Sequence, residues 1–131
     1  MIGLDTNVLV RFLVRDDEAQ YERARRLIRR EAHGGEPVCI SLVVLLETEW
    51  VLRSRYELSK DEILSALSAL LSAVDLQFED EAAIEEALFV WQEASAQFAD
   101  CLIGARYRAL ACSATATFDA GALKLPGFVA A

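Results

Sequence analysis

Apolar positions along the chain follow two patterns, short continuous runs and longer stretches with helical spacing. The short runs predict strands at 1–4, 37–40, 75–79 and 113–118. Stretches in which apolar residues recur every three or four positions predict helices at 6–13, 16–33, 41–55, 59–73, 80–94 and 98–111. Because the predicted strands alternate with helices, the expected fold class is α/β, with a mainly parallel sheet covered by helices.

The length and composition favour one compact domain. The chain has 131 residues, 54% of them hydrophobic, and we expect a single domain over 1–131 with a substantial core. No apolar run approaches the ~20 residues of a membrane span. No basic segment precedes the early acid Asp5, so we expect no signal peptide. Three cysteines without CxxC spacing are expected to be reduced core residues of a cytoplasmic protein.

Charge is distributed unevenly along the chain. The formal net charge is -8, which argues against a protein that grips nucleic acid by surface charge alone. Seven arginines nevertheless lie in the first thirty residues, whereas 61–105 contains ten acids and no Lys or Arg. The N-terminal arginines could face a polyanion, or they could be an ordinary solvated helix surface.

Two acids follow predicted strands. Asp5 comes after the first strand and Asp119 after the last, and ligands of parallel α/β sheets bind beyond the carboxyl ends of strands. Each has an equally physical structural interpretation. Asp5 would cap the helix that follows it, and Asp119 would form an Asx-turn.

Two further acids lie on predicted helices. The neighbours of Glu47 at helical spacing are apolar, which predicts that it faces the core, where a carboxylate needs a metal or an arginine partner. Glu49 is expected on the solvated side. Asp100 opens a helix, where its charge would also favour the helix dipole.

The four acids are expected to share one edge of the sheet, because right-handed crossovers gather strand ends and helix starts there. Crowded carboxylates repel one another unless a divalent cation neutralises them, and ligands that are all oxygen suit Mg²⁺ or Mn²⁺. We therefore predict Asp5, Glu47, Asp100 and Asp119 as metal-binding, catalytic residues. The only histidine, His33, excludes ribonuclease chemistry that needs two histidines.

Four motifs, in this order, resemble those of PIN domains, particularly the toxins of VapBC-type toxin–antitoxin pairs. The motifs are Leu4-Asp5-Thr6-Asn7, Ser41–Glu47 with Trp50-Val51-Leu52, Phe98-Ala99-Asp100, and Thr117-Phe118-Asp119 with Leu125-Pro126-Gly127. The resemblance covers nearly the whole chain. It implies an α/β/α sandwich, Mg²⁺- or Mn²⁺-dependent cleavage of RNA, a homodimer and a neutralising antitoxin.

The chain departs from the family pattern at two places. Gln97 stands where many relatives have an acid, and Ala120-Gly121-Ala122 stands where relatives often carry an acid or a bulky residue. These departures predict weaker metal binding or fewer ions.

Other polar residues are candidates for supporting roles. Thr6, Asn7 and Thr117 would orient ligands or waters, or simply cap helices and favour strands. Arg11 and Arg15 are candidates for contacts to RNA phosphates. Trp50 and Trp91 are expected in the core.

Several rival functions remain open at the level of sequence. The chain could be a PIN nuclease of RNA maturation outside a toxin system, or a catalytically weak PIN module that binds nucleic acid. A phosphatase using Asp5 as nucleophile is disfavoured, because Asn7 replaces the second acid of the DxD pattern.

Overall fold

The computed structural model describes residues 1–131 as two compact units, Met1–Glu79 and Asp80–Ala131. Each unit combines helices with one pair of parallel strands, and each is described by itself. The predicted α/β class with parallel strands is confirmed. That the whole chain forms a single domain stays a prediction.

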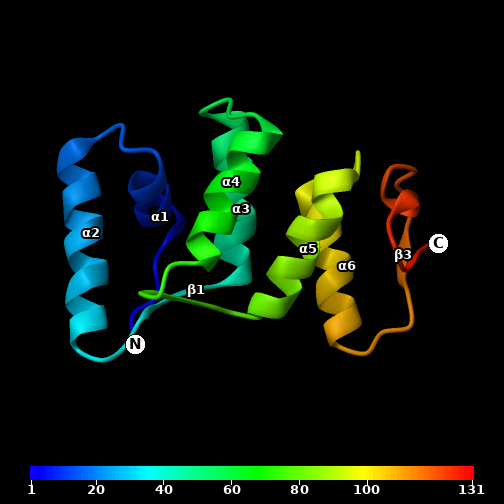
Figure 1. Cartoon of the computed structure of the whole chain (residues 1–131). Helices are drawn as coiled ribbons and strands as arrows, with labels where there is room; N and C mark the ends of the chain where they lie inside the picture. The colour runs from blue at the N-terminus through cyan, green and yellow to red at the C-terminus, as the bar shows by residue number, and fades with distance from the viewer. The chain divides into compact units, whose positions relative to one another are not determined.

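The first unit has four helices and two strands (Figure 1). Helix α2 packs on α1, α1 on α3, and α3 on α4, whereas α2 also touches β1 and α4 touches β2. In chain order the elements are α1 (Thr6–Leu13), α2 (Glu18–His33), β1 (Val38–Ile40), α3 (Leu42–Ser54), α4 (Lys60–Leu71) and β2 (Leu76–Phe78).

Strand β1 is central to the pairing in this unit. It runs parallel to β2 with Cys39 opposite Gln77. On its other side the predicted first strand is reduced to one parallel bridge, between Gly3 and Cys39. Leu4 N–H donates to the Cys39 carbonyl at 3.0 Å, and Cys39 N–H donates to that of Ile2 at 2.8 Å. Asp5 therefore lies directly after a short segment that pairs in parallel with β1, at the carboxyl end of that segment, as the sequence predicted.

Side-chain caps determine where the helices begin. Asp5, Asp17, Ser41 and Asp80 each accept a backbone N–H of the helix that follows. Ser59 and Glu62 form a capping box at the start of α4. These side chains accept hydrogen bonds from backbone N–H groups that would otherwise be unsatisfied in the first turn, and so determine the residue at which each helix begins.

The buried side of α3 differs from the prediction. Leu45, Thr48, Glu49 and Leu52 are buried, whereas Glu47 is exposed. The placement of Glu47 in the core and of Glu49 in solvent was therefore wrong. Apolar residues occur on all sides of this helix, so periodicity could not choose between two stripes. Burial of Glu49 is compensated by Arg53, one turn on, at 2.9 Å.

Two expectations about core residues also fail. Trp50 is 54% exposed and lies on the same side of α3 as exposed Val43, so only Trp91 is a core tryptophan. Cys101 is buried and Cys39 partly so, but Cys112 is exposed. None of the three forms a disulfide.

The second unit is built on two packed helices, α5 (Glu81–Glu93) and α6 (Phe98–Ala109). It also contains β3 (Thr115–Thr117), the 3-10 helix η1 (Ala122–Lys124) and β4 (Phe128–Ala130), with β3 and β4 parallel. The sequence did not predict β4. Gly104 of α6 makes room for the ring of Phe128, because a Cβ there would lie 2.6 Å from it.

No helix in the structure has both the length and the apolar character needed to cross a membrane.

Replacing Arg53 by Met is expected to lower the free energy of unfolding by about 1–2 kcal/mol. The change leaves the buried Glu49 carboxylate without its partner. Because the Arg53 side chain is 44% exposed, the loss should fall below that of a fully buried pair. Urea unfolding measures it. Arg55→Met is the control, since Arg55 is exposed and forms no ion pair, and it should change stability by less than about 0.5 kcal/mol. Equal losses of unfolding free energy in both variants would contradict the claim that Arg53 compensates the buried Glu49 carboxylate.

Candidate functional site

Asp5 is both a helix cap and an exposed acid. One carboxylate oxygen, Oδ1, accepts the N–H of Thr6 at 2.8 Å, which fixes the side chain at the start of α1. Its residue is exposed, and no ion pair involves it. The cap therefore holds the carboxylate in place and leaves the second oxygen, Oδ2, available to a ligand.

Asp5 and Glu47 line the same pocket in the first unit, about 230 Å³ in volume. The pocket is formed by the start of α1 and by one side of α3. Beside it, Thr6 is 7% exposed, and its Oγ1 is a buried polar atom without a hydrogen-bond partner. Buried hydroxyls are nearly always satisfied, so this unsatisfied atom suits a pocket that takes a polar ligand or an ordered water.

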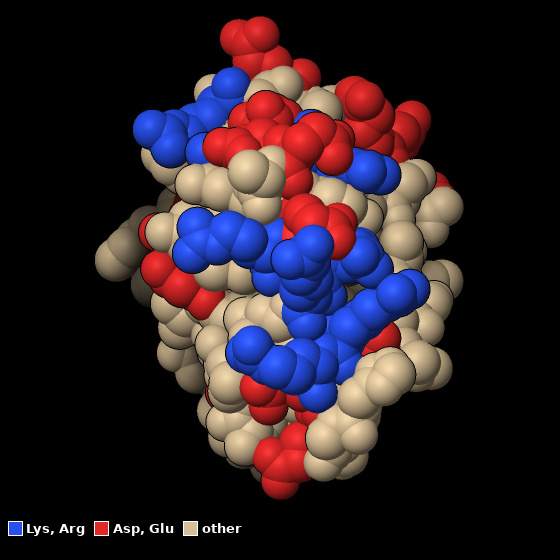
Figure 2. All heavy atoms as spheres, turned by 90° about the vertical axis from the view of Figure 1, so that its left-hand side faces the viewer, with Lys and Arg blue, Asp and Glu red and all other residues tan.

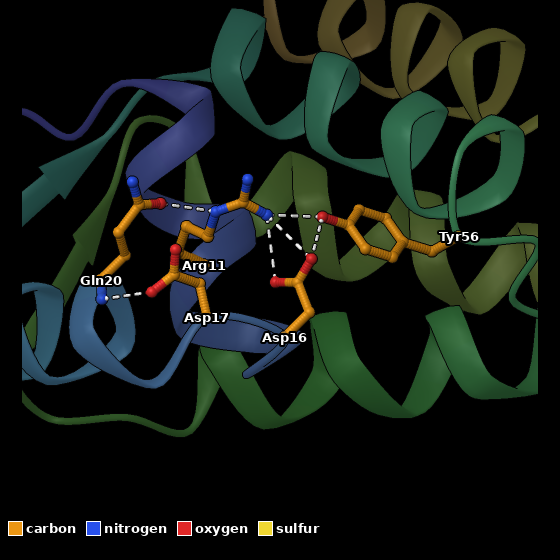
Figure 3. Close-up of polar contacts among 5 residues, drawn as sticks. All are labelled: Arg11, Asp16, Asp17, Gln20 and Tyr56. Carbon is orange, nitrogen blue, oxygen red and sulfur yellow. Dashed lines mark hydrogen bonds and ion pairs between the residues drawn. The ribbon is translucent and has the colours of Figure 1, made fainter.

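Two arginines also line this pocket, in different electrostatic states. Arg11 is fully engaged (Figure 3): it donates to Gln20 at 2.6 Å, to Tyr56 at 2.7 Å and to both oxygens of Asp16 at 3.0 Å. The Tyr56 hydroxyl also donates to Asp16, which with the Arg11 charge lowers the pKa of that carboxyl. By contrast, exposed Arg55 forms no ion pair.

Asp100 and Asp119 form a second acidic pair, in the second unit. Asp100 lies in the first turn of α6, and Asp119 follows β3 after one residue. Burial raises the pKa of Asp100, and the charge of Asp119 raises it further. Asp119 is held locally: its N–H donates to Thr117 Oγ1 at 3.0 Å, and its Oδ2 accepts the N–H of Ala122 at 3.2 Å.

None of the four predicted acids is neutralised by an ion pair. In the first unit the arginines pair with other acids or with none. In the second, Arg106 pairs with Asp80 at 3.0 Å and Arg108 with Glu86 at 2.7 Å. These four carboxylates therefore have no cationic side-chain partner, although the chain also contains arginines that form no ion pair, such as Arg55.

The donor chemistry of each pair fits a hard divalent cation. No group of three or more His, Cys, Asp or Glu side chains in the structure could hold a metal ion. The structure does bring Asp5 together with Glu47, and Asp100 together with Asp119. Both pairs offer only carboxylate oxygens, the ligands that Mg²⁺ and Mn²⁺ prefer. The pKa of Asp100 is raised mainly by burial and further by the charge of Asp119, and a bound cation would offset both effects.

Comparison with known families decides what kind of domain this is. The family model described as PIN domain matches residues 2–127. The chain belongs to the PIN-domain family. A search of curated proteins returned no match.

Membership confirms the predicted PIN-like α/β fold. PIN domains are generally nucleases that act on nucleic acid with divalent metal ions, so the chain belongs to a family of metal-dependent hydrolases. The matched segment includes Asp5, Glu47, Asp100 and Asp119. Their individual roles in this PIN domain stay predictions.

Thr6, Asn7 and Thr117 lie close to the acids, whereas Arg15 lines neither the pocket of Asp5 nor any other described pocket. Thr6 and Asn7 line the pocket of Asp5, and Thr117 bonds the backbone of Asp119. Arg15 lies 4.0 Å above the ring of Tyr21 and pairs with Glu18 at 3.4 Å. Gln97, the departure from the family pattern, is the N-cap residue of α6 but makes no side-chain capping bond.

Sequence reasoning missed Arg55. Glu47, Val51 and Arg55 are spaced four residues apart, which places them on one side of α3. This spacing was readable in the sequence. Because Glu47 was expected to face the core, Arg55, on the same side of the helix, was not considered as an exposed neighbour of the acid.

Replacing Asp100 by Asn is expected to stabilise the metal-free protein near neutral pH. A raised folded-state pKa means that the Asp100 contribution to stability is fully present below about pH 3.8 and is lost as pH rises through that pKa. Above it, the ionised side chain is destabilising. In EDTA, the Tm of Asp100→Asn should exceed that of the wild type by about 1–3 °C at pH 7.

The same Tm difference should disappear toward pH 4. Asp61→Asn is the control, an exposed acid in the first turn of α4. It removes a charge that favours the helix dipole without relieving any repulsion, so it should not raise Tm. A Tm of Asp100→Asn at or below that of the wild type at pH 7 would contradict the account.

Proposed function

We propose that this PIN domain is a Mg²⁺- or Mn²⁺-dependent endoribonuclease whose metal ligands are Asp5, Glu47, Asp100 and Asp119. The observation that carries the proposal is that Asp5 shares a pocket with Glu47, that the charge of Asp119 adds to the burial that raises the pKa of Asp100, and that none of the four forms an ion pair. A carboxylate that is partly buried or that faces another carboxylate is costly without a cation, and a bound metal would remove that cost.

The residues of the chain would divide the work in the following way. When bound, Mg²⁺ or Mn²⁺ would supply an activated water and offset the charge that develops on the phosphate. Asp5 and Asp119 each spend one oxygen on a backbone N–H and keep the other for a ligand. Thr117 fixes the backbone of Asp119, and Thr6 offers a hydroxyl to a water or ligand. These bonds hold the ligands in position before the ion binds.

The biological role that fits best is the toxin of a type II toxin–antitoxin pair of the VapBC type. The four motifs of the sequence support this role, together with a homodimer and a cognate antitoxin as partners in the cytoplasm. A small antitoxin reading frame next to the gene would separate this role from RNA maturation.

The nuclease proposal predicts that purified protein cuts a mixed RNA pool with Mg²⁺ or Mn²⁺ and not with EDTA. Asp5→Asn and Asp100→Asn, one from each acidic pair, should each lower kcat by at least about 100-fold, because each removes a metal ligand. The double variant should lose no more than about the worse single variant, since residues that act as a unit are not additive.

The matched control for Asp5→Asn is Asp17→Asn. Asp17 caps α2 as Asp5 caps α1, and asparagine preserves both caps. Asp17→Asn should keep wild-type activity. Cutting that survives both EDTA and Asp5→Asn would sink the metal mechanism. A wild type that binds RNA without cutting it under any metal would favour the binding-module alternative.

Arg55 is expected to position the substrate phosphate beside the acids. Arg55→Gln should raise KM for RNA about three- to tenfold and change kcat by less than about twofold, because phosphate contacts position the strand. Steady-state cleavage kinetics measure both constants. Arg29→Gln, which removes another exposed arginine without an ion pair, should leave KM unchanged. A loss confined to kcat would contradict the positioning role.

A further inference from the structure

A second, larger groove lies between α1 and α2 in the first unit. Its volume is about 680 Å³, and four of its lining residues are arginines while none is an acid. The arginines are Arg11 from α1 and Arg23, Arg26 and Arg30 from α2. Figure 2 shows Lys and Arg side chains gathered on the face that carries α2. This feature is called the α1–α2 groove.

The arginines of α2 retain unneutralised charge. Arg23 is exposed and forms no ion pair. Arg30 approaches Glu31 only to 3.7 Å, with its side chain 72% exposed. Arg26 shares Glu22 with Arg25, so one carboxylate serves two guanidinium groups. In a protein of net charge -8, this groove is a local site for an anion.

The spacing of these arginines suits a polyanion. Arg23, Arg26 and Arg30 lie three and four residues apart, on one side of the helix. At about 1.5 Å per residue the row spans roughly 10 Å along α2. A stacked nucleic-acid strand advances about 3.4 Å per phosphate, so the row matches about three consecutive phosphates.

The α1–α2 groove and the acidic pocket are neighbours on α1. Asn7 and Arg11 line both the groove and the pocket that contains Asp5 and Glu47. An anionic strand could not be held by the acids themselves, because they would repel it. An adjoining basic groove is therefore where the strand must be gripped if it is to reach the acids.

We infer that the α1–α2 groove binds the phosphodiester backbone of a single RNA strand and leads it to Asp5. This inference rests on the proposed function, for which it names the substrate track. Arg23 and Arg30 bind phosphates, and Leu27 on the groove floor offers an apolar surface to the sugar or base. Among anions, the RNA strand fits better than an acidic polypeptide, because the groove shares Asn7 and Arg11 with the pocket beside which the strand would be cut.

The experiment measures binding of a fluorescein-labelled single-stranded RNA of mixed sequence by anisotropy, in EDTA so that cleavage cannot occur. Arg23→Glu should weaken binding about tenfold at low salt and reduce the slope of log K against log salt by about one or more. Arg29→Glu is the matched control. It makes the same charge change at an exposed, unpaired arginine of the same helix, outside the groove. It should weaken binding less than about twofold.

Four outcomes would overturn the inference. Equal losses in both variants would mean that diffuse charge binds the RNA and not the groove. A wild type that fails to bind RNA in EDTA, or an Arg23→Glu variant that binds it normally, would mean that the groove is not the track. Normal RNA binding with loss of poly-glutamate binding in Arg23→Glu would assign the groove to an acidic polypeptide.

Failure of the inference is distinguishable from failure of the nuclease proposal. The binding assay contains no metal, and its decisive variant lies outside the acidic pairs. If Asp5→Asn abolishes metal-dependent cleavage while Arg23→Glu binds and cuts RNA like the wild type, only the groove assignment falls. If Arg23→Glu loses RNA binding but no metal supports cleavage by the wild type, only the nuclease falls.

Discussion

Burial and a neighbouring negative charge both raise the pKa of a carboxyl group, and this PIN domain retains both at Asp100, in the first turn of α6, near Asp119. The chain contains arginines that could relieve the repulsion, yet Arg106 and Arg108 are committed to Asp80 and Glu86. In the first unit, Arg11 and Arg53 likewise pair with Asp16 and Glu49, and Asp5 and Glu47 form no ion pair in their pocket. An energetic cost that the fold leaves uncorrected is the usual mark of a functional site.

Local backbone chemistry explains how carboxylates persist in these positions. Asp5 caps α1, and Asp119 accepts the N–H of Ala122, so each acid stabilises the chain with one oxygen. The structural and the functional interpretations of these acids are therefore compatible. A basic surface complements them: the arginines of the α1–α2 groove adjoin the acids without neutralising them.

The sequence predicted most elements, because the spacing of apolar residues is a local signal: α2 and α4 lie where the helices at 16–33 and 59–73 were expected. It failed where tertiary packing decides. Helix α3 is apolar on all sides, so only packing selects Glu49 for burial, with Arg53 as its partner. Strand β4 is three residues long and depends on pairing with β3, which no local pattern records. The four candidate acids could be identified from sequence motifs. That Arg55 forms no ion pair could not be predicted, because it depends on Arg11 and Arg53 pairing with the nearby acids Asp16 and Glu49.

The most direct test of the central claim is to titrate Mn²⁺ into the protein and to follow the free ion by electron paramagnetic resonance. The account predicts saturable binding by the wild type and by Asp17→Asn, and a large loss of affinity in both Asp5→Asn and Asp100→Asn. Such a result would mean that metal binding depends on both acidic pairs. Undiminished Mn²⁺ binding in either variant, or none in the wild type, would contradict the claim that these uncompensated carboxylates exist to hold a metal.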